Sequence, residues 1–284
     1  MRRFVDLHTH SLASDGATAP AEVVALAERK QLAALALTDH DTLAGLPEAV
    51  AAARGLPLRF IPGVEMSAPC QKGALHILGL GVDPASPALH RALADLRRFR
   101  AERNPRIVAR LRQLGMDVTM AELERFAGAG DKADHVVGRL HLANFMVRRG
   151  YVRDVDEAFD RFLGAGRPAY VDKERMQARD VIAAIHRAGG VAVMAHPPQT
   201  QYANLAQLAR GVRELVDCGL DGLEVYHSDH TPQQTRSYLE LARRLGLLIS
   251  GGSDYHGQAK ADVRLGRPSV PLEAVRQLLA RIAD

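Results

Sequence analysis

Residues 4–11, with the sequence Phe4-Val5-Asp6-Leu7-His8-Thr9-His10-Ser11, decide the fold. Phe4 to Leu7 predict a short buried strand, along which side chains alternate between the two faces. His8 and His10 therefore project to the same side where this strand ends, and Asp15 follows after a turn. Two imidazoles and a carboxylate can bind a metal ion. Two solvent-facing histidines and a turn aspartate would give the same pattern, so the rest of the sequence is needed to distinguish a metal site from exposed residues.

Composition indicates a folded, mildly basic protein. Of the 284 residues, 47% are hydrophobic and 25% are charged, which argues against a disordered chain. The net charge of +4 favours anionic partners only weakly. Cys70 and Cys218 lie far apart without a CxxC spacing, which argues against a disulfide framework or a thiolate zinc site. No stretch resembles a signal peptide or spans a bilayer, so we expect a soluble cytoplasmic protein with no membrane partner and no obligate protein partner.

Short apolar runs alternate with helical patterns over residues 1–87 and 167–284, which predicts an α/β fold. The expected strands are residues 4–7, 33–37, 58–61, 74–80, 191–195, 222–226 and 247–250. About seven βα units result, one fewer than the usual eight of such barrels. We therefore predict one barrel domain, with a parallel sheet inside and helices outside.

Residues 88–166 interrupt this alternation. Helical patterns cover residues 89–114, 120–126, 136–149 and 155–163, with no convincing strand among them. This segment is predicted to be an inserted helical subdomain. It is rich in arginine, and a solvated helix face explains most of these side chains.

Polar residues collect where the predicted strands end. They are His8, His10, Asp15, His40, Glu65, His76, His196, Asp254 and His256. Nitrogen and oxygen ligands without sulfur suit Zn²⁺, Mn²⁺ or Fe²⁺. One ion needs about four protein ligands, so this set is too large for one metal and predicts a site for two or three.

Six motifs resemble those of the PHP (polymerase and histidinol phosphatase) family of metal-dependent phosphoesterases. They are Asp6-Leu-His8-Thr-His10-Ser, Thr38-Asp39-His40-Asp41, Gly63-Val-Glu65, His76-Ile-Leu-Gly, Ala195-His196-Pro197 and Gly252-Ser253-Asp254-Tyr-His256. The resemblance spans the chain and implies a distorted (β/α)₇ barrel that holds three divalent ions, with Mn²⁺ favoured and Zn²⁺ or Fe²⁺ as alternatives. It assigns the first ion to His8, His10, Glu65 and Asp254, the second to Glu65, His76 and His196, and the third to Asp15, His40 and His256.

The inserted segment and one later motif resemble a particular branch of this family. The matching stretches are Arg100-Ala-Glu-Arg103-Asn104, Gly138-Arg139-Leu-His141, Gly166-Arg167-Pro168 and Glu224-Val-Tyr226-His-Ser-Asp-His230. The branch usually has Arg-Pro-His where this chain has Arg139-Leu140-His141, a mild departure. Its members include nucleoside 3',5'-bisphosphate phosphatases, which convert pAp to AMP, and enzymes that remove nucleotides from RNA 5' ends. The resemblance therefore implies a helical subdomain that caps the substrate.

The hypothesis for the reaction is attack on the 3'-phosphate by a hydroxide that bridges the first two metals. Glu65 and Asp254 hold the reacting metals, and His230 is the candidate acid for the leaving oxygen. Arg100, Arg103, Asn104 and His135 are the candidates for binding the second phosphate. Tyr226 is the candidate for stacking on the base. These residues could also have a purely structural role. The arginines could lie on an exposed helix face, His135 could lie at the start of a helix, and Tyr226 could belong to the barrel core.

The sequence also allows three alternative functions. A 5'-3' exoribonuclease that acts on short 5'-phosphorylated RNA would use the same residues. A non-catalytic nucleic-acid-binding module would use the arginines alone, but it would not need nine polar residues at strand ends. An amide hydrolase is the third alternative, and Glu65, in the place of a bridging lysine, argues against it. Asp39 and Asp41, which flank His40, are predicted to be structural supports or hydrogen-bond partners of the ligands rather than ligands themselves, and His227 is predicted to be an ordinary core or surface residue.

Overall fold

The computed structural model describes residues 3–70, 73–128, 137–171 and 176–282. These residues form one eight-stranded sheet in the order β7-β6-β5-β4-β3-β2-β1-β8. The strands are β1 (Phe4–Asp6), β2 (Ala34–Leu37), β3 (Arg59–Ala68), β4 (Leu75–Leu80), β5 (Val191–Met194), β6 (Gly222–Tyr226), β7 (Leu248–Gly251) and β8 (Val270–Pro271). The α-helices are α1 (Pro20–Arg29), α2 (Leu46–Ala53), α3 (Pro87–Gln113), α4 (Met120–Phe126), α5 (Arg139–Arg148), α6 (Val155–Ala158), α7 (Ala178–Arg187), α8 (Leu205–Asp217), α9 (Pro232–Leu245) and α10 (Arg276–Arg281).

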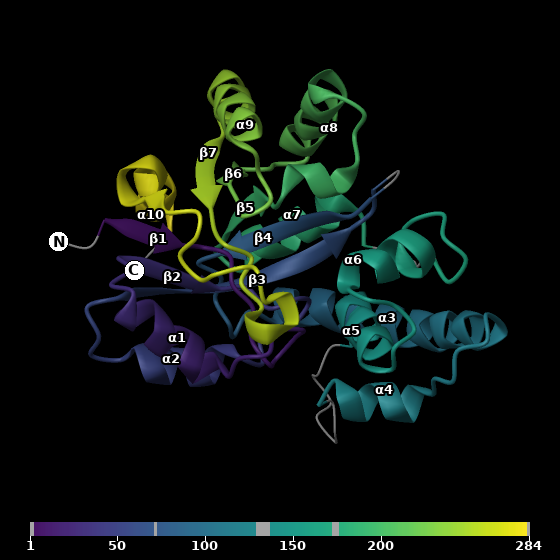
Figure 1. Ribbon diagram of the computed structural model, residues 1–284. Coiled ribbons are helices and arrows are strands. Elements are labelled where there is room, and N and C mark those ends of the chain that lie inside the picture. The colour runs from purple at the N-terminus through teal and green to yellow at the C-terminus, as the bar shows by residue number, and fades with distance from the viewer. Residues whose placement is uncertain (1–2, 71–72, 129–136, 172–175, 283–284) are drawn as a thin grey trace.

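The sheet curls until its first and seventh strands meet. The Leu7 amide, just after β1, donates a hydrogen bond to the Gly251 carbonyl at 3.1 Å, and Thr9 forms a parallel bridge with Tyr255. Helices surround the strands, with α1 and α2 on one side and α8 and α9 on another (Figure 1). The structure is therefore a nearly closed α/β barrel, and the predicted fold class is confirmed.

The sheet is not fully parallel, and here the sequence-based expectation was wrong. β4 runs antiparallel to both β3 and β5, and β8 runs antiparallel to β1. β3 is also longer than predicted, because it continues through Pro62-Gly63, which the prediction treated as the end of a strand. Pro62 still takes part in the sheet through its carbonyl, which accepts hydrogen bonds from the Gly81 and Val82 amides. Glu65 consequently lies within β3 instead of after it.

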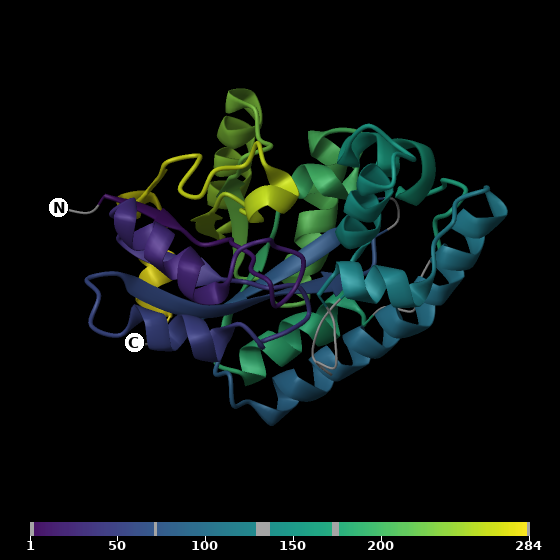
Figure 2. The same cartoon turned by 60° about the horizontal axis from the view of Figure 1, so that its bottom comes forward.

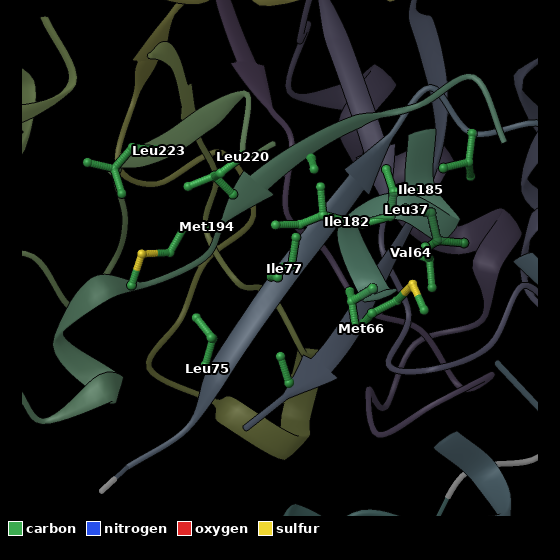
Figure 3. Packing of buried hydrophobic residues seen from close by; sticks show 14 of the residues in the cluster. Leu37, Val64, Met66, Leu75, Ile77, Ile182, Ile185, Met194, Leu220 and Leu223 are labelled. Carbon is green, nitrogen blue, oxygen red and sulfur yellow. The ribbon is translucent and has the colours of Figure 1, made fainter. Parts of the chain in front are cut away.

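Alternate residues of the strands face two separate cores. Leu35 and Leu37 of β2 belong to the cluster beneath the outer helices, whereas Ala34 and Ala36 face the barrel interior. Figure 3 shows Ile182 and Ile185 of α7 packed against the strands that carry Val64, Met66 and Ile77. The interior cluster is completed by Leu278, Leu279 and Ile282 in and just after α10. This two-sided burial is what the near-continuous apolar strands require.

The 27-residue helix α3 connects the barrel to the inserted helices. Its first half packs in the outer barrel core through Leu89, Leu93 and Leu96, and its second half joins a third cluster through Ile107 and Leu111. That third cluster is otherwise built from residues 116–171 of the insertion. Figure 2 shows α3 running from beneath the barrel to the outer end of the insertion. The domain limits at residues 88 and 166 stay a prediction.

Candidate metal centre and substrate cavity

The nine candidate ligands come together at one edge of the barrel. His8 and His10 follow β1, His40 follows β2, His196 follows β5, and Asp254 and His256 follow β7. His76 is different, because it lies near the amino end of β4, and the antiparallel direction of that strand brings its start to the same edge. All nine except His40 and His76 are buried.

One group consists of His8, His10, Glu65 and Asp254, whose ligand atoms all lie within 4.8 Å of one another. Glu65 Oε2 is 3.3 Å from His8 Nε2 and 3.2 Å from His10 Nε2. Asp254 Oδ1 is 3.3 Å and 3.1 Å from the same two nitrogens. Four potential ligand atoms thus converge on one point.

Two further groups adjoin this one. Glu65 Oε1 lies 2.8 Å from both His76 Nδ1 and His196 Nε2, and these two nitrogens are 3.3 Å apart. On the other side, Asp15 lies with His40 and His256, and its Oδ1 is 3.2 Å from His256 Nε2. Glu65 therefore belongs to two groups, as the family resemblance implied.

The arrangement fits divalent cations. Within the described residues, His8 Nε2, His10 Nε2 and Glu65 Oε2 are buried without a hydrogen-bond partner. Such polar atoms are costly to bury unless a cation or another partner completes the site. Imidazole nitrogen and carboxylate oxygen are the donors that Mn²⁺, Zn²⁺ and Fe²⁺ accept.

Burial and neighbouring charges set the protonation states of the candidate ligands. Burial lowers the pKa of His40 to about 3 and also lowers that of His76, so both rings are neutral at pH 7. His10 is also buried, but the carboxylates of Asp254 and Glu65 outweigh this effect and raise its pKa to about 10. For Glu65, burial is outweighed by His40, His76 and His8, which hold the carboxyl pKa well below its usual range. A metal ion would therefore meet ionised carboxylates, and it would have to displace a proton from His10.

Glu224 is a supporting residue that the sequence-based assignment missed. Its Oε1 lies 3.0 Å from His8 Nδ1, and its Oε2 accepts a hydrogen bond from the His196 amide at 2.7 Å. Although Glu224 is buried, His8 and His227 lower its pKa to about 2. An ionised carboxylate at this point keeps a proton on His8 Nδ1 and leaves Nε2 to bind a metal. The sequence feature that could have indicated this role is a charged residue inside the otherwise apolar strand β6.

His227 also lies at this centre and is buried, although the sequence gave it no role there. Its Nδ1 accepts a hydrogen bond from the Asp229 amide at 3.0 Å. In the neutral ring the proton is therefore on Nε2, which lies 3.6 Å from Asp254 Oδ2. Asp39 accepts hydrogen bonds from the Ser11 amide at 2.8 Å and the Ser14 hydroxyl at 2.6 Å, so it holds the loop that carries His10 and Asp15.

A cavity of about 370 Å³ opens above the candidate metal centre. The barrel contributes Asp15, His40, His76, His196, Asp254, His256 and Lys260 to its lining, the insertion contributes Arg100, Arg103 and Arg139, and Tyr170 lies just after the insertion. This volume lies in the usual range for small-molecule sites. The insertion therefore forms one wall of the cavity over the ligand cluster.

The two predicted arginines differ in their surroundings. Arg100 Nε donates to Asp41 Oδ2 at 2.6 Å, and its Nη2 donates to the Ser67 hydroxyl at 3.0 Å. Arg103 lines the cavity and donates to Asn104 Oδ1, which is 2.7 Å from Nη2. Asn104 donates in turn to the Val137 carbonyl at 2.9 Å and is absent from the cavity lining.

Neither Tyr226 nor His230 lines the cavity. Tyr226 packs against both barrel cores, in keeping with its structural reading. His230 is absent from the lining, and its Nδ1 lies 3.0 Å from the Val225 carbonyl, to which it donates. Burial lowers the pKa of His230 to about 4, so the ring has no proton on Nε2 at pH 7. This geometry does not support His230 as the acid. His135 lies outside the described residues.

Comparison with known proteins identifies the family. The PHP domain model matches residues 6–222, which is most of the chain. The chain belongs to the PHP domain family. It is therefore a metal-dependent phosphoesterase, a hydrolase that acts on phosphate esters, and the predicted family is confirmed.

Two curated PHP relatives and one solved structure align along most of this chain. A 3',5'-nucleoside bisphosphate phosphatase from Chromobacterium violaceum is 37% identical, over 98% of this chain and 97% of the relative. A 5'-3' exoribonuclease from Haemophilus influenzae is 35% identical, over 90% of this chain and 91% of the relative. A solved structure of an amidohydrolase from Chromobacterium violaceum, with bound sulfate and no metal, superposes with a TM-score of 0.86 at 36% identity, covering 99% of this chain and 98% of that one. In the described part of this PHP protein, no helix has the length and apolar character needed to cross a membrane.

Proposed function

We propose that this protein removes the 3'-phosphate of nucleoside 3',5'-bisphosphates and so converts pAp to AMP and phosphate. One observation carries the proposal: a single cavity is lined by six of the nine candidate ligands on its barrel side and by Arg103 from the insertion. A substrate with two phosphates can occupy both. The 37% identity to a 3',5'-nucleoside bisphosphate phosphatase, over nearly the whole of both chains, supports the same choice.

The barrel residues would hold three divalent ions, with Mn²⁺ favoured. His8, His10, Glu65 and Asp254 hold the first, Glu65, His76 and His196 the second, and Asp15, His40 and His256 the third. When bound, such ions neutralise the phosphate charge and lower the pKa of water toward neutrality, which supplies a nucleophile. Glu65 and Asp254 keep these positions anionic, and Glu224 orients His8 through its Nδ1.

Arg103 is the residue to which we assign the second phosphate. Its guanidinium lies at the cavity wall, where a charged N–H donor can bind a phosphate oxygen. Asn104 acts through Arg103, since its Oδ1 accepts from the arginine while its amide donates to Val137. Arg100 has a different role in this proposal, because its buried ion pair with Asp41 fixes α3 against the barrel. We assign no role to Tyr226 or His230 in binding or proton transfer, and the role of His135 stays a prediction.

A 5'-3' exoribonuclease activity is the second candidate, and the 35% identity to the Haemophilus influenzae enzyme favours it. A 5'-phosphate on Arg103 and a 3'-phosphodiester over the ligand cluster would use the same cavity. A non-catalytic nucleic-acid-binding module is disfavoured, because it gives no reason for buried ligand atoms without partners. The compartment that we propose is the cytoplasm, where the thiols of Cys70 and Cys218 would stay reduced.

Phosphate release from a substrate panel tests the proposal. The Mn²⁺-loaded protein is assayed at neutral pH with pAp, AMP, 3'-AMP, histidinol phosphate and a short 5'-phosphorylated RNA. We expect fast release from pAp and none from AMP. Mononucleotide release from the RNA without turnover of pAp would instead support the exoribonuclease.

A further inference from the structure

Lys260 is a cation of the cavity that no motif pointed to. It ends the 3₁₀ turn Gly257–Lys260, which begins directly after the candidate ligand His256. In Figure 1 this turn is the short yellow coil on the barrel side that faces the insertion. Lys260 lines the same cavity as Arg103, and its side chain is 28% exposed. An ammonium group therefore lies beside the candidate metal centre and reaches solvent through the cavity.

The contact with Asp254 holds this ammonium in place. Lys260 Nζ lies 2.6 Å from Asp254 Oδ2, whereas the other oxygen, Oδ1, lies 3.3 Å from His8 Nε2 and 3.1 Å from His10 Nε2. The lysine thus uses the carboxylate oxygen that does not converge with the other ligand atoms. It can stay in position when a metal ion binds to Oδ1.

The ammonium has more donors than this one contact uses. A lysine carries three N–H donors, and Asp254 accepts one of them. A compact, fully charged donor at a cavity wall is suited to bind a phosphate oxygen. Positive charge consequently reaches the cavity from the barrel side as well as from the insertion.

We propose that Lys260 is a phosphate-contacting residue of this cavity: Asp254 holds its ammonium at the wall, where it donates to an oxygen of the phosphate that is cleaved. This inference rests on the proposed phosphoesterase function, but it does not depend on which phosphate ester is the substrate.

Titration of the Mn²⁺-loaded protein with inorganic phosphate tests the contact. Replacing Lys260→Met removes one charge-assisted hydrogen bond, and we expect the phosphate Kd to rise about tenfold. Lys260→Arg keeps the charge and the donors and should stay within about threefold of the wild type. Lys30→Met, at an exposed site after α1, is the matched control and should leave phosphate binding unchanged.

A second titration separates phosphate contact from support of Asp254. Because loss of a neighbouring cation favours a divalent ion, metal-free Lys260→Met should bind Mn²⁺ as tightly as the wild type or more tightly. Wild-type phosphate binding by Lys260→Met, or a loss of Mn²⁺ affinity that parallels the loss of phosphate affinity, would overturn the proposal. Should Lys260→Met fail to fold, Lys260→Gln keeps a donor without the charge and should raise the phosphate Kd by several-fold. Phosphate binding that depends on Lys260 in a protein that leaves pAp intact would refute only the nucleotide assignment.

Discussion

The barrel edge and the insertion wall bring opposite charges to the same cavity. The barrel edge holds the carboxylates of Asp15, Glu65 and Asp254 among buried imidazoles, so it is a site for cations. The insertion wall holds Arg100, Arg103 and Arg139, so it favours anions. A phosphate ester bound with divalent ions satisfies both sides. The comparison suggests that the barrel carries the chemistry and the insertion selects the substrate, and the following predictions test that division.

The largest effect should come from Glu65, which has close contacts with five of the candidate histidine ligands. Glu65→Gln removes the charge shared by two ligand groups, and we expect kcat/KM to fall by at least about 10³-fold, with fewer bound metal ions. Steady-state kinetics and metal analysis of the purified variant check this. Glu124→Gln, at an exposed position of α4, is the control. Full metal content with near-normal turnover would remove Glu65 from the centre.

On the insertion side, substitution of Arg100 and substitution of Arg103 should have different effects. Arg103→Ala should raise KM for pAp roughly 10- to 100-fold, because a charged hydrogen bond to substrate is lost. Arg100→Ala should instead lower the free energy of unfolding by about 3 kcal/mol, since it leaves buried Asp41 without its cation. Urea denaturation and kinetics of both variants make the test. Equal effects of the two substitutions would contradict the division of roles.

Glu224→Gln should weaken metal binding about 10- to 100-fold, because the carboxylate that orients His8 is lost. Calorimetric titration of the metal-free protein with Mn²⁺ measures this, and Glu240→Gln on α9 is the exposed control. Unlike Arg103→Ala, this variant should lose Mn²⁺ affinity while substrate affinity of the fully loaded enzyme stays close to normal. A wild-type Mn²⁺ affinity would mean that His8 is oriented by its packing alone.

The smallest expected effect is the pH dependence of the Mn²⁺ affinity. His10 has a pKa of about 10 in the metal-free protein, so its ring is protonated at pH 7, whereas burial keeps the His40 ring neutral, with a pKa of about 3. Although burial lowers the pKa of His8, the carboxylates of Glu224, Glu65 and Asp254 raise it well above its usual value. Binding of Mn²⁺ must therefore displace protons from both His8 and His10, so the affinity should rise with pH between 7 and 10, by at least about tenfold per unit. Titrations at pH 7 in two buffers with different ionisation enthalpies should reveal proton release. Identical heats in both buffers would mean that Mn²⁺ binding releases no proton, which would contradict the prediction.

The barrel was the more predictable of the two regions. Alternation of side chains and the position of histidines at the ends of apolar runs were enough to predict the fold and to gather the candidate ligands. The sequence did not reveal that β3 continues through Pro62-Gly63 or that β4 is antiparallel, because hairpin pairing depends on contacts between strands. The family resemblance nevertheless included Glu65 and His76 in the ligand set.

The insertion was less predictable, for a physical reason. Arg100 and Arg103 are three residues apart and share one face of α3, so helical periodicity cannot separate them. Their difference comes from Asp41, which lies 59 residues before Arg100. Lys260 gave no signal at all, since a lysine after a turn is solvent-exposed by default. Roles that depend on how a helix or loop packs against a distant segment require the structure.

The most direct test of the central claim follows the two phosphates of pAp separately. ³¹P NMR of the reaction with the Mn²⁺-loaded protein distinguishes the 3'-phosphate, the 5'-phosphate and free phosphate. We predict that the 3'-phosphate signal decays as free phosphate grows, while the 5'-phosphate signal persists as AMP. Loss of the 5'-phosphate, or no change in either signal with the fully loaded protein, would contradict the account.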